Sequence, residues 1–162
     1  MSFSEPAGPA CAASPRTLWV ELTSKCPFDC VFCSRKLRRG DGEHLPFPVY
    51  GRLLEGLHSP RRLVLNYSGE SLCYPDLLSA IELGCARGAF VELVTAFPPV
   101  GRDTLRALAG GGLGRLTVSL HATAPERYRA IYGRGSIEGL ESRLAEFLEL
   151  CRDVPWPPAV DL

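Results

Sequence analysis

The stretch Leu18-Trp19-Val20-Glu21-Leu22 is followed, after Thr23-Ser24-Lys25, by three cysteines, Cys26, Cys30 and Cys33. Aliphatic, branched and aromatic residues dominate the first stretch, and no glycine or proline interrupts it, which is typical of a β-strand. The C-x3-C-x2-C spacing then puts three thiols in a single loop at the end of that strand. The sequence therefore predicts a strand that leads directly into a thiol-rich loop.

Strand and helix patterns alternate along the remaining sequence. Further strands are predicted over residues 63–67, 90–95 and 116–120, and helices over residues 47–57, 75–86, 102–109 and 136–151. Each helix is expected to bury one apolar face, and the residues predicted for these faces include Val49, Leu53, Leu78 and Leu148. Because a helix separates each strand from the next, the order predicts βα units around a parallel sheet. Residues 159–162 predict the start of a fifth strand.

One face of the fourth predicted strand is polar, because Thr117, Ser119 and His121 alternate with apolar residues. Unless these residues simply end the strand, a sheet covered by apolar helices on both faces would bury them at a cost. A barrel whose lumen holds a polar ligand accommodates them better. We therefore predict an α/β fold of the partial (βα) barrel type. A closed barrel needs about eight strands, so the chain is expected to be truncated after about four βα units.

Composition and charge exclude several classes of protein. Apolar residues make up 46% and charged residues 22% of the 162-residue chain, as in an ordinary globular domain. The 18 basic and 18 acidic side chains cancel, so neither nucleic acid nor an anionic membrane is expected as a partner. No apolar run approaches the roughly 20 residues of a spanning helix, and no export signal is recognisable. We expect a cytoplasmic protein with a mobile tail at residues 1–16 and one domain at residues 17–162.

The cysteine loop predicts a metal centre. The chain has seven cysteines, an odd number for a disulfide framework, and those outside the loop are scattered. Thiolates are ligands that both iron–sulfur clusters and zinc accept. A structural zinc site usually closes with four ligands, and His44 or His58 could supply the fourth, although neither has a usual spacing. Three thiols alone fit a centre that keeps one coordination position open.

At this point the residues from Leu18 to Cys33, with the aromatic Phe32 before the third cysteine, resemble the radical S-adenosylmethionine enzymes. The resemblance implies a partial barrel with a [4Fe–4S] cluster held by Cys26, Cys30 and Cys33. It also implies that S-adenosylmethionine binds the fourth iron and is cleaved reductively to methionine and a 5′-deoxyadenosyl radical. The similarity extends over residues 17 to about 150.

Two further segments are similar to motifs of the same family. Gly69 and Glu70 stand where the family carries Gly-Gly-Glu-Pro-Leu, with Ser68 in place of the first glycine. The resemblance implies that they hold the amino group of S-adenosylmethionine. Ser119 and His121 stand where the family has a Ser-Leu-Asp type of strand ending, which implies contacts with the methionine carboxylate or the ribose.

The third predicted strand departs from the family pattern. Many relatives read Thr-Asn-Gly where this chain has Thr95-Ala96-Phe97. Thr95 is still expected to line the cofactor pocket, whereas the role of the asparagine has no counterpart here.

The sequence therefore predicts a radical S-adenosylmethionine enzyme. Its substrate would be an unknown small molecule or peptide. An electron donor such as a flavodoxin or ferredoxin would reduce the enzyme. Two alternatives stay open: a non-catalytic iron–sulfur module and a zinc-binding domain. We also expect the strand at 116–120 to be an unpaired edge, which would favour association of this chain.

Overall fold

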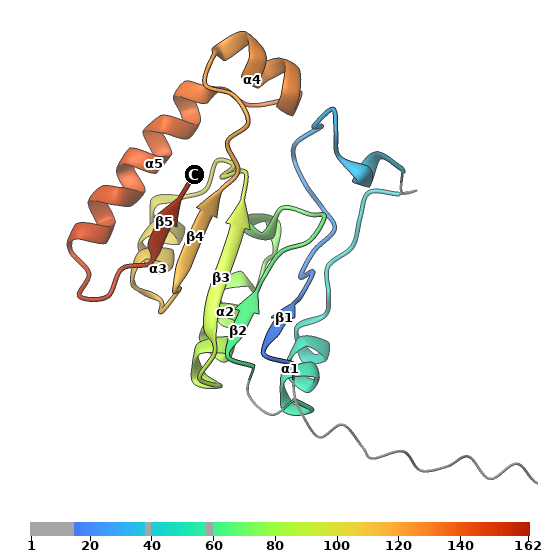
Figure 1. Ribbon diagram of the computed structural model, residues 1–162, viewed down its shortest axis with the longest axis vertical. Helices are drawn as coiled ribbons and strands as arrows, with labels where there is room; N and C mark the ends of the chain where they lie inside the picture. Colours follow the sequence, from blue (N-terminus) through green and yellow to red (C-terminus); the bar gives the residue numbers. More distant parts are fainter. Residues whose placement is uncertain (1–14, 38–39, 58–59) are drawn as a thin grey trace, which may run out of the picture.

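A single parallel sheet organises the chain in the computed structural model, which describes residues 15–37, 40–57 and 60–162 (Figure 1). The described strands are β1 (Thr17–Trp19), β2 (Arg62–Val64), β3 (Phe90–Thr95), β4 (Arg115–Val118) and β5 (Ala159–Asp161), and they lie side by side in chain order. The described α-helices are α1 (Phe47–Glu55), α2 (Leu77–Ala86), α3 (Arg102–Gly110), α4 (Pro125–Tyr132) and α5 (Ile137–Arg152), with short 3-10 helices η1 (Ser34–Leu37) and η2 (Ser71–Cys73). All neighbouring strands pair in parallel, as the alternation of elements predicted.

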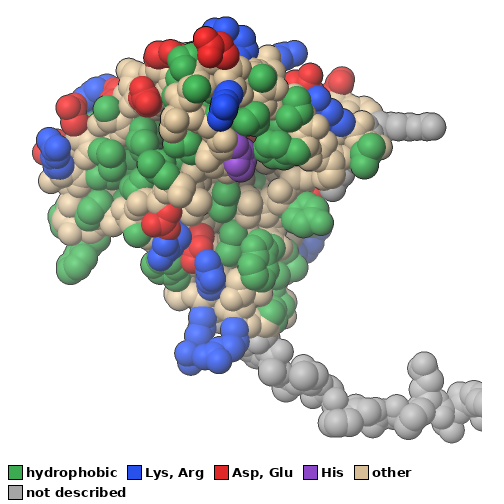
Figure 2. Space-filling view, turned by 45° about the horizontal axis from the view of Figure 1, so that its top comes forward, with side chains coloured by type: hydrophobic (Ala, Val, Ile, Leu, Met, Phe, Trp, Pro, Cys, Tyr) green, Lys and Arg blue, Asp and Glu red, His purple; other side chains and the backbone are tan. Residues whose placement is uncertain are grey.

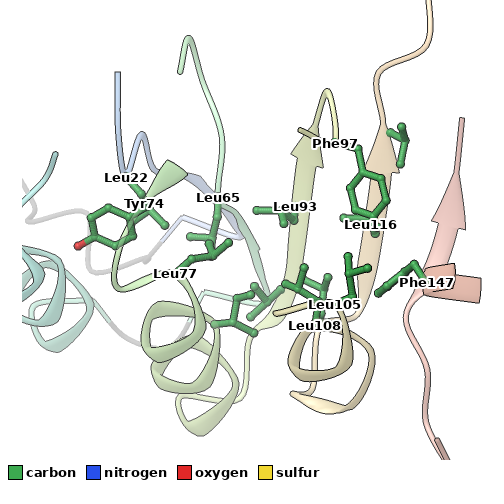
Figure 3. Close-up of a cluster of buried hydrophobic side chains, with 14 of the residues drawn as sticks. Leu22, Leu65, Tyr74, Leu77, Leu93, Phe97, Leu105, Leu108, Leu116 and Phe147 are labelled. Atoms are coloured by element: carbon green, nitrogen blue, oxygen red, sulfur yellow. The ribbon is translucent and has the colours of Figure 1, made fainter. Parts of the chain in front are cut away.

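Helices cover one face of the sheet, and the core lies between them. Alternate strand residues point to this side and are fully buried, namely Leu63, Leu65, Val91, Leu93, Leu116 and Val118. Figure 3 shows leucines of the sheet facing Leu77 of α2 and Leu105 and Leu108 of α3. At the upper end of the same layer, Phe97 packs against Phe147 of α5. This layer fixes the strands, and with them the loops at their carboxyl ends.

The opposite face of the sheet is open. Arg62 donates two hydrogen bonds to Glu92 on this face, and Arg115 is paired with Asp161. Trp19, at the end of β1, is exposed. In Figure 2, basic and acidic side chains lie interspersed over much of the visible surface, in keeping with the balanced charge of the sequence. An open, partly polar face is what a partial barrel leaves on its lumen side, so the predicted fold class is confirmed.

Three expectations about local structure need correction. Four of the helical residues predicted to be buried, Val49, Leu53, Leu78 and Leu148, are exposed. In α1, for example, the buried face is centred on Tyr50 and Leu54, and apolar residues at the border of such a stripe stay accessible. The strand at 116–120 ends at Val118, and it is not an edge, because β5 pairs with it in the register Leu116↔Val160. The edges of the described sheet are β1 and β5.

Most of the predicted tail at residues 1–16 lies outside the described residues, as does His58. In the described part of the chain, no helix combines the length and apolar character needed to cross a bilayer.

Candidate functional site

A cavity of about 190 Å³ lies at the carboxyl edge of the sheet. Its lining includes every residue predicted for the site, namely Cys26, Cys30, Cys33, Gly69, Glu70, Thr95, Ser119 and His121. These residues come from the segments that follow β1, β2, β3 and β4. Because the carboxyl ends of parallel strands meet at one edge, residues far apart in the sequence are brought together there.

The cysteine loop is fastened to the end of α4. The backbone N–H of Asp29 donates to the carbonyl oxygen of Tyr132 over 2.9 Å, and that of Val31 donates to Ile131 over 2.9 Å. The last carbonyls of a helix have no partner within it, so here they serve the loop. Gly133 ends the helix with φ +69°, and a Cβ atom at that position would lie 3.1 Å from the Cβ atom of Asp29. A glycine suits both demands.

The three loop thiols face the cavity and are only partly exposed. Burial raises the pKa of the Cys26 thiol above its usual value of 9.0. Burial also raises the pKa of Cys30, and the neighbouring Cys26 and Cys33 add to that effect. Both thiols are therefore protonated at neutral pH without a cation, and a bound metal centre would displace their protons.

The donor set fits a cluster with an open position better than a closed zinc site. Among the residues that the structure describes, no group of three or more His, Cys, Asp or Glu side chains is arranged to hold one metal ion. His44, one of the two histidines considered as a fourth zinc ligand, lines a separate cavity with Glu21 and Glu43. A four-iron cluster is larger than a single ion, so its thiol ligands need not converge on one point.

An aromatic group forms one wall of the cavity. The ring of Phe32 meets that of His121 edge-on at 4.9 Å, and His121 stacks on Tyr132 at 5.8 Å. Phe28 contacts the edge of Tyr132 at 5.6 Å. The hydroxyl of Tyr132 donates to the carbonyl oxygen of Ser119. Sequence analysis singled out Phe32 and His121 but missed Phe28 and Tyr132, whose contacts depend on the packing of α4.

Gly69 lines the cavity and also lies in a tight contact between two loops. A Cβ atom at this position would lie 1.9 Å from the carbonyl oxygen of Thr23 and 2.9 Å from that of Lys25. The backbone N–H of Glu70 donates to that Lys25 oxygen over 2.8 Å. The glycine therefore permits close contact between two loops of the chain.

The carboxylate of Glu70 is the most buried charged group of the cavity, with 3% of the residue exposed. Its Oε1 atom accepts hydrogen bonds from Leu72 N, over 3.1 Å, and from Thr95 Oγ1, over 2.5 Å. Its Oε2 atom accepts one from Ala96 N over 2.8 Å. A carboxylate offers about four acceptor positions, so one position on Oε2 remains available to a ligand. Burial raises the pKa of Glu70, and these hydrogen bonds counteract the rise.

The remaining predicted residues also lie in the cavity lining. Thr95 directs its hydroxyl to Glu70, so it acts on the cavity through that carboxylate. In the lining, Ser119 is half-buried and His121 is exposed, and Ser119 N donates to Thr95 O over 2.7 Å. Ala96 has no amide side chain, but its backbone N–H reaches Glu70. Despite the departure from Thr-Asn-Gly, the turn thus supplies two of the three donors to the carboxylate.

Comparison with protein families gives a match over most of the chain. The sequence profile of the Radical SAM superfamily matches residues 20–160. The chain is 30% identical over 112 residues to the PqqA peptide cyclase of Rhodopseudomonas palustris, an alignment that covers 67% of this chain and 29% of that protein. It is 31% identical over 114 residues to a probable GTP 3′,8-cyclase of Pyrobaculum aerophilum, which covers 69% of this chain and 36% of that protein. The chain therefore spans about a third of the length of these relatives.

Solved structures share the fold at lower sequence identity. SuiB of Streptococcus suis, in a crystal structure bound to S-adenosylmethionine, superposes with a TM-score of 0.71 at 18% identity, covering 87% of this chain and 33% of that one. BtrN, in complex with AdoMet and 2-DOIA, superposes with a TM-score of 0.61 at 19% identity, covering 91% of this chain and 56% of that one.

Proposed function

Because the chain belongs to the radical SAM superfamily, we propose that its cavity binds a [4Fe–4S] cluster and S-adenosylmethionine and supports reductive cleavage of that cosubstrate. The family is one of enzymes, and it implies this pair of cofactors. The observation that carries the proposal is the meeting of three loop thiols and a buried carboxylate with one available acceptor position in a single cavity.

Each residue then has a defined task. Cys26, Cys30 and Cys33 would hold three irons of the cluster, which leaves the fourth iron open to the cosubstrate. Glu70 would accept a hydrogen bond from the amino group of S-adenosylmethionine at Oε2, because a buried carboxylate is a strong acceptor for an amine. Ser119 would serve as a further polar contact in the cavity lining. When bound, the reduced cluster supplies the electron that cleaves S-adenosylmethionine to methionine and a 5′-deoxyadenosyl radical.

The substrate class and the electron donor are part of the proposal. One similar protein is named as a cyclase of the peptide PqqA, and SuiB has been crystallised with the precursor peptide SuiA. Other relatives are named as GTP cyclases. A peptide or a small molecule is therefore the substrate we propose, with a small redox protein such as a flavodoxin or ferredoxin as donor. We propose that the protein works in the reducing interior of a cell, because unpaired thiols persist there.

Anaerobic reconstitution tests the cluster. The protein should take up about four irons and four sulfides per chain, and Cys30→Ala should abolish this uptake. Cys85→Ala is the matched control, because Cys85 lies on α2 and its thiol donates to the carbonyl oxygen of Gly112. One zinc per chain without sulfide would refute the cluster.

Titration with S-adenosylmethionine tests the cosubstrate site. The electron paramagnetic resonance of the reduced cluster should change on binding, and 5′-deoxyadenosine should form with reductant. Glu70→Gln should keep the cluster but weaken binding by about 1.5–3 kcal/mol, or ten- to a hundredfold. In either orientation of the new amide, its NH2 group would face one of the backbone N–H donors that now point at Glu70. An unchanged affinity would remove Glu70 from the proposal.

A binding module without catalysis is the second candidate, and the open face of the sheet favours it. Among the described residues, Trp19 and Arg62 are exposed on that face. A site that does not exclude water loses part of its electrostatic advantage. A wild-type chain that binds S-adenosylmethionine but forms no 5′-deoxyadenosine would select this candidate.

A further inference from the structure

The turn that follows β3 contains a residue in an uncommon backbone conformation. Phe97 has φ +56°, and it is the single described residue other than glycine with a positive φ. An L-residue in this region is strained, especially one with a bulky side chain. Such a conformation persists only where the surrounding structure holds it, and residues of this kind cluster at functional sites.

Contacts on three sides hold Phe97 in place. Its N–H donates to Thr95 Oγ1 over 2.8 Å, and its fully buried ring meets Phe147 edge-on at 5.9 Å. Its carbonyl oxygen accepts two hydrogen bonds from Arg143 on α5, over 3.1 Å from Nε and 2.8 Å from Nη2. A paired contact from a planar guanidinium fixes the direction of that carbonyl as well as its position.

The turn at residues 95–97 determines how the Glu70 carboxylate is oriented. Because Thr95 Oγ1 accepts the N–H of Phe97, the hydroxyl proton of Thr95 is directed at Glu70 Oε1. The next residue, Ala96, donates its N–H to Glu70 Oε2. Two of the three donors that surround the carboxylate therefore belong to the turn that Arg143 holds from the outer helix.

We infer that Arg143 is a positioning residue for the ligand-binding carboxylate of Glu70, acting through the carbonyl of Phe97 and the turn at 95–97. The inference rests on the proposed role of Glu70 toward S-adenosylmethionine. Arg143 itself is absent from the cavity lining, so its effect on binding must be indirect. With the guanidinium removed, the turn can relax its strained residue, and the acceptor position left on Oε2 loses its fixed direction.

The test compares S-adenosylmethionine binding to reconstituted wild type, Arg143→Met, Glu70→Gln and the double variant, followed by the paramagnetic resonance of the cluster. Arg143→Met should weaken binding roughly three- to tenfold, the range for a lost hydrogen-bonding contact, with iron and sulfide content unchanged. Arg143→Lys, which keeps one donor, should recover part of the loss. Glu146→Gln is the matched control, because Glu146 lies on the same helix and is paired with Arg102 at the surface.

The double variant separates an indirect role from a direct one. If Arg143 acts through Glu70, Glu70→Gln with Arg143→Met should bind no more weakly than Glu70→Gln alone. Additive losses, or an Arg143→Met affinity equal to wild type while Glu70→Gln is impaired, would overturn the inference and leave the proposed function standing. A Glu70→Gln affinity equal to wild type would overturn both. If Arg143→Met does not fold, Arg143→Lys and its double variant with Glu70→Gln give the same decision.

Discussion

The N–H of Glu70 donates to the carbonyl oxygen of Lys25 over 2.8 Å, so the loop after β2 is joined to the residue that directly precedes Cys26. The same residue therefore links two parts of the site: its backbone holds the start of the cysteine loop, and its side chain faces the cavity. A movement of either loop must move the other. Gly69 makes this junction possible, because its missing side chain lets the backbones approach.

Gly69→Ala should break the junction. The new methyl group would meet the Thr23 carbonyl at 1.9 Å, so the backbone must shift. We expect a loss of about 2–4 kcal/mol in the free energy of unfolding, together with poorer uptake of iron and sulfide. Gly51→Ala is the control, because that position lies within α1 and has no heavy atom within 4 Å of the added Cβ. It should raise the stability by up to about 1 kcal/mol in urea unfolding, and a Gly69→Ala protein as stable as wild type would contradict the expectation.

Tyr132→Phe should lower the stability by about 1 kcal/mol, because the hydroxyl of Tyr132 donates to the carbonyl oxygen of Ser119. Tyr128→Phe should cost little, because the buried hydroxyl of Tyr128 has no partner among the described residues. Urea unfolding of the two variants at neutral pH measures both effects. Equal losses in the two would contradict the assignment.

The same tyrosine predicts a loss of stability at high pH. Burial raises the pKa of Tyr132 from 10.0 to about 12 in the folded chain. Tyr132 therefore keeps its proton to a higher pH in the folded state than in the unfolded state. The free energy of unfolding should fall as the pH rises from 10 to about 12. The stability of Tyr132→Phe should fall less steeply over that pH range, as measured by denaturant unfolding. Ultraviolet absorbance follows the ionisation of the tyrosines in parallel. Parallel curves for the two proteins would be the contrary result.

Phe97→Gly and Phe97→Ala separate backbone strain from packing. Both variants lose the buried ring, which should cost about 3–5 kcal/mol. Glycine accepts the left-handed conformation without a steric penalty, so Phe97→Gly should be more stable than Phe97→Ala by about 1 kcal/mol. Chemical unfolding of the pair measures the difference. A more stable alanine variant would mean that the turn relaxes when the ring is lost.

Thr95→Val should weaken S-adenosylmethionine binding about three- to tenfold, because it removes the donor to Glu70 Oε1 and the acceptor of the Phe97 N–H. Thr95→Ser keeps the hydroxyl and should bind as wild type does. Loss of a donor to the ionised carboxylate should also raise the pKa of Glu70 further above its ordinary value. Affinities measured by cluster spectroscopy decide the first point, and equal binding by Thr95→Val and Thr95→Ser would refute it.

The features that the sequence alone determined are those with a local cause. The spacing of Cys26, Cys30 and Cys33 places them in one loop whatever the rest of the chain does. The alternation of strand and helix patterns reflects periods of two and 3.6 residues, and it predicted the parallel sheet and the location of most elements. Ser119 and His121 follow Val118, where β4 ends, and both line the cavity at the carboxyl edge of the sheet. The polar pattern therefore located residues of the cavity, although these residues end the strand and do not form one of its faces.

Tertiary structure alone decided how those residues are held. The N–H groups of Asp29 and Val31 donate to carbonyl oxygens at the end of α4. The carboxylate of Glu70 accepts hydrogen bonds from the turn at 95–97. These partners are 25 to more than 100 positions apart in the sequence, so no local sequence pattern predicts that they bond. Packing between distant segments also decided that β5 pairs with β4, so that β4 is not an edge. It likewise brought Arg143 to the carbonyl oxygen of Phe97. A backbone hydrogen bond between distant segments depends on where packing brings them, and only the folded chain contains that information.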